Sequence, residues 1–161
     1  MSSIVLNDLK FEKFDRSFQE FDIGDPKEDQ ISIIAEKIDE LRKLCWLNLG
    51  VSRNKVNMSK FLNCIQNDID KLNTNDLLNC LEKIKFDQKV KLSEPNRRAL
   101  NLLLDLKNRQ ITTITLLKAC LFREESRGGH YRDDFPHKDK NWECHTRQQL
   151  DQKIQKRLIK N

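Results

Sequence analysis

The chain has 161 residues, of which 30 are Lys or Arg and 25 are Asp or Glu, so its formal net charge is +5 and its pI is near 9.0. A chain of this length forms one domain with a single core, which excludes a second catalytic domain within these residues. The charged fraction of 34% and the mean hydropathy of -0.73 indicate a very polar surface. They do not indicate disorder, because apolar residues recur with helical spacing between Ile31 and Leu121.

Phenylalanines mark residues 1–25, which we expect to form an N-terminal arm. Their spacing of three, four and three residues would place all the rings on one face of a helix; they are Phe11, Phe14, Phe18 and Phe21. We expect this stripe to pack on the core of the domain or on a neighbouring part of a longer chain, because an exposed apolar face needs a cover. A surface that stacks nucleic-acid bases is the less favoured alternative, since the charges around the rings are mixed.

Apolar residues at helical spacing predict four helices between residues 26 and 124. The first begins at Asp25-Pro26-Lys27-Glu28, where Asp caps the helix and Pro occupies its first position, and it ends at Gly50. The other three run from Val56 to Leu72, from Leu77 to Ile84 and from Ser93 to Leu121. No stretch alternates polar and apolar residues for long enough to predict a sheet. The predicted fold class is therefore all-α, a bundle of about four to five helices with a spectrin-repeat-like three-helix core.

The last segment, residues 147–161, is predicted to form a short helix after an irregular loop. Thr146-Arg147-Gln148-Gln149 has the form of a capping box, and Leu150, Ile154 and Leu158 then recur every four residues. Basic residues flank this apolar series, and we expect their face to be solvated or to bind an acidic surface. An RNA-binding arm is the less favoured interpretation of the same face, and nucleic acid is not expected as a partner.

Cysteine usage and the lack of targeting segments predict a soluble cytoplasmic protein. The five cysteines are an odd number at wide spacings, and the first four fall at apolar positions of predicted helices; they are Cys45, Cys64, Cys80, Cys120 and Cys144. We expect five reduced core thiols, because disulfides are rare in cytosolic proteins. The N-terminus lacks the apolar region of a signal peptide, and no segment approaches the ~20 apolar residues that span a bilayer.

The sequence contains none of the common motifs for cofactor or metal chemistry. Its four glycines, Gly24, Gly50, Gly128 and Gly129, cannot form a dinucleotide or a P-loop fingerprint. A zinc site from His130, His137, Cys144 and His145 is disfavoured, because there is no C-x-x-C and adjacent ligands strain a tetrahedral site. Cys144 and His145 also fail as a nucleophile and base pair, since sequence neighbours rarely face each other. We therefore predict no catalytic, cofactor-binding or metal-binding residue in this chain.

One stretch, Arg123 to Thr146, is unusually dense in hydrogen-bonding and titratable groups. Gly128-Gly129 is predicted to end the fourth helix, with Arg123 and Arg127 favourably placed in its last turn. The residues that follow mix aromatic and charged side chains, a composition typical of a loop pinned by buried rings and Arg–Asp pairs. We interpret residues 125–146 as a docking loop.

The order of residues in this loop resembles a known family signature. It reads Glu125-Ser126-Arg127-Gly128-x-His130-x-Arg132-x-Asp134-Phe135-Pro136, followed by Trp142-x-x-His145-Thr146. This order is similar to the C-terminal signature of the succinate dehydrogenase/fumarate reductase flavoprotein family, and within it to the L-aspartate oxidase branch. The likeness covers roughly residues 26–150. Gly129 departs from it, since relatives usually carry a larger residue there.

The resemblance implies that the chain is the helical C-terminal domain of a longer, FAD-dependent flavoprotein. It implies packing against the protein's own flavin-binding domain, which would hold the FAD and the catalytic residues, so this chain alone is expected to be colourless and inactive. The implied interdomain docking residues are Glu125, Ser126, Arg127, Gly128, His130, Arg132 and Asp134. Among them, Arg127, His130 and Arg132 are expected to bond across the seam between the two domains.

Two alternatives stay open. The chain could be the C-terminal region of a flavoprotein subunit of succinate dehydrogenase or fumarate reductase, although those usually continue past the His-Thr pair into strand-like sequence. It could also be a free-standing basic helical interaction module. In each case the expected divisions are an arm at 1–25, a bundle at 26–124, the docking loop at 125–146 and a terminal helix at 147–161.

Overall fold

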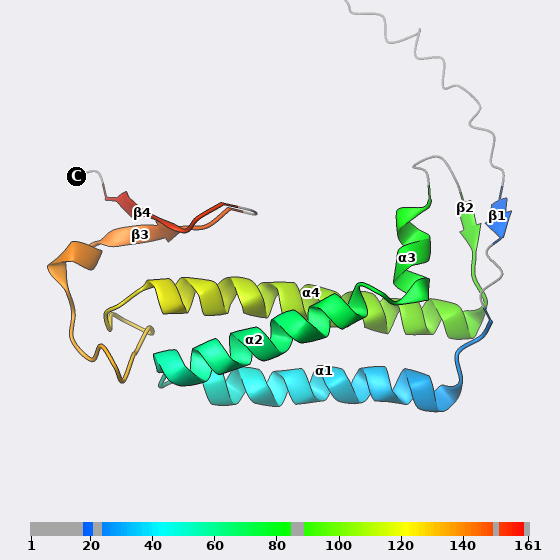
Figure 1. Ribbon diagram of the computed structural model, residues 1–161, viewed down its shortest axis with the longest axis horizontal. Coiled ribbons are helices and arrows are strands. Elements are labelled where there is room, and N and C mark those ends of the chain that lie inside the picture. The colour runs from blue at the N-terminus through cyan, green and yellow to red at the C-terminus, as the bar shows by residue number, and fades with distance from the viewer. Residues whose placement is uncertain (1–17, 21–23, 85–88, 150–151, 160–161) are drawn as a thin grey trace, which may run out of the picture.

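Three long helices lie side by side and a short fourth helix stands across one end of them (Figure 1). The computed structural model describes residues 18–20, 24–84, 89–149 and 152–159. The helices are α1 (Glu28–Leu49), α2 (Lys55–Leu72), α3 (Asp76–Glu82) and α4 (Glu94–Phe122). Helix α4 packs against each of the other three. The four predicted helices and the predominantly helical fold class are therefore confirmed.

Side-chain caps fix most of the helix starts. Asn54, Asn75 and Ser93 each accept a hydrogen bond from a backbone N–H in the first turn of α2, α3 and α4, respectively. The predicted start of α1 was wrong, because Asp25 does not cap that helix. Its carboxylate accepts hydrogen bonds from Ser93 and Asn96 at the start of α4 instead, and so joins the beginnings of the two helices.

The core consists of two apolar clusters along α4. The larger one lies between α1, α2 and α4, and its centre is Met58 and Leu117, which have no exposed surface. The smaller one lies where α3 crosses the bundle and contains Ile31, Leu77 and Leu103. Each apolar face predicted from helical spacing is thus buried against another helix, which is the main stabilising contribution in a bundle of this kind.

The structure contains two small sheets that the sequence did not predict. Strand β1 (Phe18–Glu20) pairs in parallel with β2 (Lys89–Lys91), and β3 (Cys144–Arg147) pairs antiparallel with β4 (Gln155–Leu158). A 3-10 turn, η1 (Lys140–Trp142), precedes β3. These strands have three or four residues each, which is too short to show the alternation that marks a strand in a sequence.

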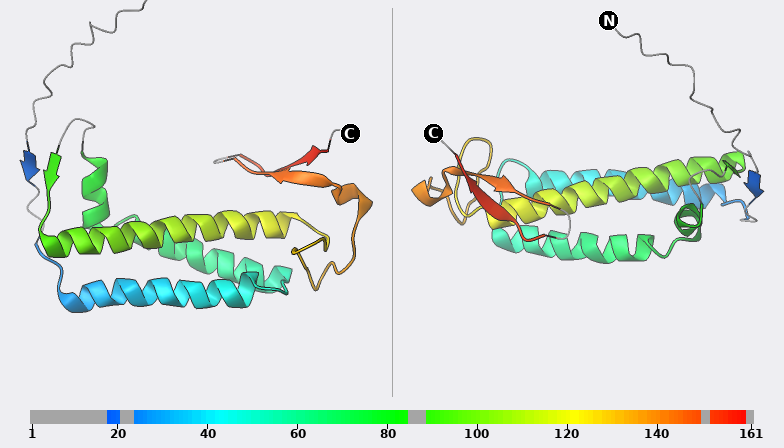
Figure 2. Two further views of the ribbon diagram at one scale, coloured as in Figure 1. Left: turned by 180° about the vertical axis from the view of Figure 1, so that it is seen from behind. Right: turned by 90° about the horizontal axis from the view of Figure 1, so that it is seen from above.

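The hairpin of β3 and β4 replaces the terminal helix predicted for residues 147–161, so that prediction was wrong. A lone short helix is marginally stable in water, because few hydrogen bonds offset the cost of starting it. Pairing with β3 satisfies the backbone of the segment and places the Lys156 ammonium 3.4 Å from the centre of the Trp142 ring. Figure 2 shows the hairpin lying over the C-terminal half of α4.

The predicted phenylalanine stripe falls mostly outside the described residues. Phe11, Phe14 and Phe21 are not described, and Phe18 begins strand β1 rather than a helix. Along the parts of the chain that are described, no helix has both the length and the apolar character needed to cross a membrane.

All five cysteines are free thiols, as predicted, but they are not all core residues. Cys120 and Cys144 are buried, Cys45 and Cys80 are half-buried, and Cys64 is exposed. The prediction of a core position was therefore wrong for Cys64, which lies on the outer side of α2 among polar neighbours such as Asp68.

Candidate functional site: a pinned loop at one end of the bundle

The candidate site is the chain between α4 and β3, which turns back over the ends of three helices (Figure 1). Helix α4 ends at Phe122, six residues before Gly128, where the predicted glycine stop begins. Gly128 and Gly129 instead form a two-residue turn, in which the backbones of Arg127 and His130 exchange hydrogen bonds of 2.8 and 3.1 Å. Gly128 has a φ of 58°, a conformation that glycine adopts without steric cost.

Glu125 is the buried anion of the loop. Its side chain has no exposed surface, and its carboxylate accepts hydrogen bonds from Arg123 and Arg127 and from the backbone N–H of Asp139. Burial alone would raise the pKa of Glu125, but the hydrogen bonds from Arg127, Asp139 and Arg123 outweigh it and lower the pKa to about 2. Glu125 is therefore ionised at neutral pH and holds two arginines in fixed positions.

Arg132 is the buried cation of the loop, and it closes the C-terminus of α4. Its side chain is 0% exposed, and Nη1 donates to the carbonyl oxygens of Cys120 and Arg123 at 2.8 and 3.1 Å. These carbonyls have no partner within the helix, so the guanidinium satisfies them and favours the negative end of the helix dipole. The other side of the guanidinium donates to both oxygens of Asp134, at 2.7 and 2.6 Å.

Asp134 extends this contact to the start of α2. One of its oxygens accepts a hydrogen bond of 3.0 Å from the backbone N–H of Lys55, the first residue of that helix. The hydrogen bonds from Arg132 lower the pKa of Asp134 to about 2, against the smaller opposing effect of burial. We name the Arg132–Asp134 pair the helix-end clamp, because it joins the last turn of α4 to the first turn of α2.

A second set of contacts joins the loop to the end of α1. Arg53 donates to the carbonyl of Leu49 at the end of α1 and to the carbonyl of Gly129 in the loop, at 3.1 and 3.2 Å. The backbone N–H of Asp133 donates to the carbonyl of Arg53, and the Asp133 carboxylate accepts from Ser52 at 2.5 Å. The loop therefore contacts one end of each long helix.

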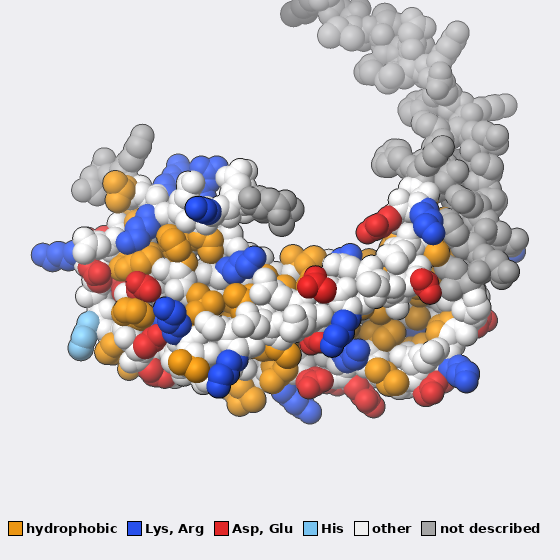
Figure 3. Space-filling view, viewed as in Figure 1, with side chains coloured by type: hydrophobic (Ala, Val, Ile, Leu, Met, Phe, Trp, Pro, Cys, Tyr) orange, Lys and Arg blue, Asp and Glu red, His pale blue; other side chains and the backbone are white. Residues whose placement is uncertain are grey.

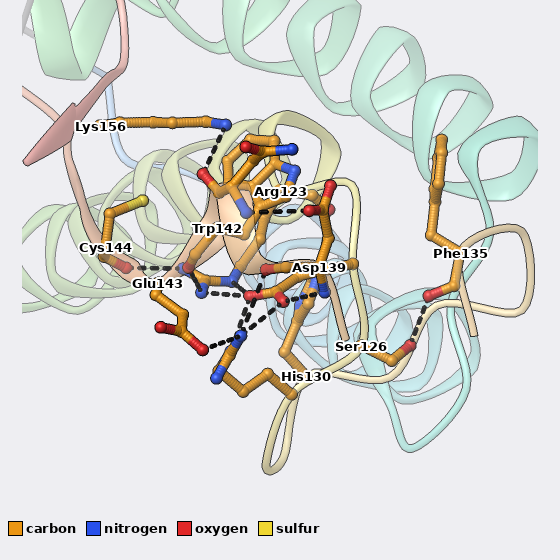
Figure 4. Close-up of polar contacts among 12 residues, drawn as sticks. Arg123, Ser126, His130, Phe135, Asp139, Trp142, Glu143, Cys144 and Lys156 are labelled. Atoms are coloured by element: carbon orange, nitrogen blue, oxygen red, sulfur yellow. Dashed lines mark hydrogen bonds and ion pairs between the residues drawn. The ribbon is translucent and has the colours of Figure 1, made fainter. Parts of the chain in front are cut away.

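Trp142 anchors the far side of the loop. It is 7% exposed and lies edge-on to Phe122, with ring centres 5.3 Å apart. Arg123 donates to the carbonyls of Trp142 and Cys144 at 2.6 and 3.1 Å, contacts that can be followed in Figure 4, and it also donates to Glu125. Ser126 ties the middle of the loop, because its hydroxyl donates to Phe135 and accepts from the backbone of Arg132.

Only part of the predicted docking set faces solvent. Arg127 keeps 33% of its side chain exposed, Gly128 is exposed and His130 is half-buried. Tyr131, which the sequence did not single out as a docking residue, is 43% exposed. Burial lowers the pKa of His130, and the positive charges of Arg53 and Arg132 lower it further. Its imidazole is therefore neutral at pH 7, with Nε2 3.3 Å from the carbonyl of Arg123.

Arg132, which was expected to bond across a seam, is completely buried within this chain. Arg132, Glu125 and Ser126 are buried inside the chain, where their hydrogen bonds hold the shape of the loop. The residue types in the signature indicated this loop, but no local pattern indicated Ser52 and Arg53. Their partners in the loop lie 76 or more residues later in the chain, so these contacts form only after folding.

The described residues show no centre for metal chemistry. Across residues 18–20, 24–84, 89–149 and 152–159, no group of three or more His, Cys, Asp or Glu side chains is placed to hold a metal ion. The charged groups of the loop are instead engaged in ion pairs and backbone hydrogen bonds. This arrangement can fix the shape of a surface, and we assign it no chemical step.

Comparisons with known proteins give a consistent result. A family profile described as "Fumarate reductase flavoprotein C-term" matches residues 38–160. The chain is 33% identical over 122 residues to an L-aspartate oxidase of Synechocystis sp., a match that covers 73% of this chain and 22% of the relative. It is 28% identical over 136 residues to an L-aspartate oxidase of Nostoc sp., covering 84% of this chain and 23% of the relative.

A third relative carries a different name. The chain is 32% identical over 110 residues to a fumarate reductase (CoM/CoB) polypeptide of Methanothermobacter marburgensis, covering 67% of this chain and 17% of the relative. The chain thus spans about a fifth of the length of these curated relatives. No solved structure gives a significant match. The matched region holds the C-terminal half of α1, the other three helices, the pinned loop and the hairpin, and the chain therefore belongs to the fumarate reductase flavoprotein C-terminal family.

Proposed function

We propose that this chain is the helical C-terminal domain of an FAD-dependent L-aspartate oxidase. The observation that supports this activity is the similarity to L-aspartate oxidases of two organisms over 73% and 84% of the chain. The reaction removes two electrons and two protons from the Cα–H and N–H bonds of L-aspartate, which gives iminoaspartate, and FAD is reduced to FADH2. The iminoaspartate would serve quinolinate and NAD synthesis in the cytoplasm.

The residues of this chain do not fit an FAD site. A dinucleotide is usually held by a glycine-rich turn at the start of a helix, and the four glycines of this chain cannot form one. The FAD would therefore be held by the flavin-bearing region of the flavoprotein, outside these residues. The proposed role of this chain is to pack against that region, with residues 26–124 as the bundle and 125–146 as the docking loop.

Within the docking loop, we propose a division of roles among the predicted residues. Glu125, Ser126 and Arg132 hold the loop in shape from inside the chain, and Asp134 does so from the surface through its bonds to Arg132 and Lys55. The exposed portions of Arg127, Gly128 and His130 face the flavin-bearing region. A surface held by buried, charge-assisted hydrogen bonds loses little conformational freedom on packing, which favours a lasting interface over a transient one.

Two other functions compete with this proposal. A role in a succinate dehydrogenase or fumarate reductase is favoured by the similarity to the Methanothermobacter protein. A free-standing basic module that binds RNA is less well supported, because acidic and basic side chains are interspersed along the face of the bundle in Figure 3 rather than gathered by sign.

The test is the substrate that reduces the flavin. We would purify the flavin-bearing region of the same organism's flavoprotein together with this chain and add L-aspartate or succinate without oxygen. We expect L-aspartate to bleach the flavin absorbance and succinate to leave it unchanged, while the 161-residue chain alone is colourless. Bleaching by succinate alone would identify the first competing function, and the absence of any flavin from the complex would contradict both.

A further inference from the structure

An apolar groove lies at the loop end of the bundle and is not part of the pinned loop. It has a volume of about 890 Å³ and is lined by residues from the C-terminal halves of α1 and α4. The left view of Figure 2 shows these two helices from the side on which both face the viewer. Its apolar walls come from Trp46, Leu47, Leu49 and Leu116, and Gly50 closes one end. We name this surface the Trp46 groove.

The exposure of these side chains is unusual for an isolated surface. Trp46 is 74% exposed, Leu47 is 70% exposed and Val51, which directly follows the groove, is 79% exposed. Single exposed apolar residues are common, but a contiguous group with a large aromatic ring typically marks an interface. The apolar area left uncovered here includes one of only two tryptophans in the chain.

Gly50 fixes this part of the backbone. A Cβ atom at position 50 would lie 2.4 Å from the carbonyl oxygen of Trp46, so only glycine allows the chain to turn this tightly at the end of α1. The turn keeps Trp46 on the last helical turn and sends Val51 directly toward the loop.

The groove is continuous with the pinned loop. Val51 is followed by Ser52 and Arg53, which bond to Asp133 and to Gly129 of the loop. Arg53 also forms a β-bridge with Arg132, next to the exposed ring of Tyr131. One partner could therefore cover the groove and the exposed edge of the loop together.

The rim of the groove carries positive charge. Arg42 and Lys43 line it, and Arg42 pairs at 3.0 Å with Asp39 in a contact that leaves both side chains more than 60% exposed. A matching surface would be apolar at its centre, with carboxylates opposite these two cations.

We propose that the Trp46 groove is the surface on which the flavin-bearing region of the same flavoprotein docks. This inference rests on the proposed function. The chain spans only 17% to 23% of the length of the relatives compared, so most of such a protein lies outside it and offers the required surface. The docking segment is apolar and flanked by acidic residues, and Trp46 is covered on binding.

The test uses the two tryptophans as separate reporters. We would incorporate fluorotryptophan into the chain and record fluorine NMR spectra of the chain alone and mixed with the unlabelled flavin-bearing region. A Trp142→Phe variant assigns the two signals. We expect the Trp46 signal to be solvent-exposed in the chain alone and to shift and lose its solvent isotope effect in the mixture, while the signal of the buried Trp142 changes little.

A matched pair of leucine variants measures the contribution to affinity. Leu47→Ser alters the groove, and Leu158→Ser alters an equally exposed leucine of β4, at 70% and 77% exposure. We expect Leu47→Ser to weaken binding about 10-fold, which corresponds to one buried leucine. Leu158→Ser should leave the dissociation constant within about 2-fold, and both chains should keep the wild-type circular dichroism spectrum because neither residue is in the core.

Several outcomes would overturn the proposal. A complex in which the Trp46 signal is unchanged shows that docking occurs elsewhere, even if that complex oxidises L-aspartate. A shift that grows with the concentration of the chain alone assigns the groove to a second copy of the chain. Protection of Trp46 in the dilute chain assigns it to a segment of the chain itself. If Trp46 is covered by the flavin-bearing region in a complex that oxidises only succinate, the docking proposal holds and the proposed L-aspartate oxidase activity is refuted.

Discussion

At the scale of single residues, the loop depends on two buried charges of opposite sign. Glu125 binds two arginines and one backbone N–H, and Arg132 binds the carbonyls at the end of α4. Neither charge is exposed to water, so each depends on its partners for stabilisation. Removing a partner leaves a buried charge unpaired, which costs more than the pair itself contributes.

Replacement of Glu125 by Gln tests this arrangement. We expect the free energy of unfolding to fall by about 3 kcal/mol at pH 7, because Arg123 loses its charged partner in a buried site. In the wild type, the folded pKa of Glu125 is about 2 against an ordinary value of 4.5. Its stabilising contribution is therefore complete above pH 4.5 and is lost as the pH falls toward 2.

Urea unfolding measured between pH 7 and pH 2 checks both expectations. The difference between wild type and Glu125→Gln should shrink as the pH falls through this window. Glu124→Gln is the matched control, because Glu124 is the exposed neighbour and should change stability by less than about 0.5 kcal/mol. Equal losses for the two variants would contradict the role of Glu125 as the buried anion.

At the scale of elements, the turn at the end of α1 has a strict steric requirement. Gly50→Ala would place a Cβ atom 2.4 Å from the carbonyl oxygen of Trp46, a backbone atom that cannot rotate away. We expect a loss of about 1–3 kcal/mol in unfolding free energy as the turn rearranges. Gly129→Ala is the control, since a Cβ there meets no atom within 4 Å, and it should cost less than about 0.5 kcal/mol. Denaturant titration of the two variants decides this, and similar costs would refute the steric argument.

The elements also show where sequence analysis succeeds. The helices of this chain were predictable because eighteen or more residues in each long helix repeat one apolar period, and a neighbouring helix covers the resulting face. The β3–β4 hairpin was not predictable, because Leu158 and the residues around it fit a helical period equally well. The position of β4 depends on pairing with β3, which begins at Cys144, and on the contact of Lys156 with Trp142 in η1.

The loop was predictable in composition but not in geometry. Its arginines and acids indicated ion pairs, and the family signature indicated their importance. Which arginine would be buried depends on Cys120 and Lys55, whose backbone atoms reach Arg132 and Asp134 only when α2 and α4 are packed. A local sequence pattern contains no information about such distant partners.

At the scale of the whole molecule, the rate at which each cysteine thiol reacts with a labelling reagent measures how well the packed bundle shields it from solvent. We expect a thiol reagent to modify the exposed Cys64 first and the buried Cys120 and Cys144 last. Burial also raises the pKa of Cys120, so less of the reactive thiolate is present. Time-resolved labelling with mass spectrometry measures the order, and Cys64→Ser should remove the fast phase. Denatured without reductant, the chain should titrate as five thiols, whereas three or fewer would reveal a disulfide.

The helix-end clamp also determines the order in which the molecule can be built. Lys55 and Asp134 are 79 residues apart in the chain, and they meet only after α2 and α4 lie side by side. A chain synthesised as far as Phe122 contains the residues of α1 to α4 but no Arg132 with which to satisfy the last carbonyls of α4. The three long helices can therefore associate while their ends at the loop are still open. The surface that the family signature encodes is complete only once the loop has packed on both α2 and α4.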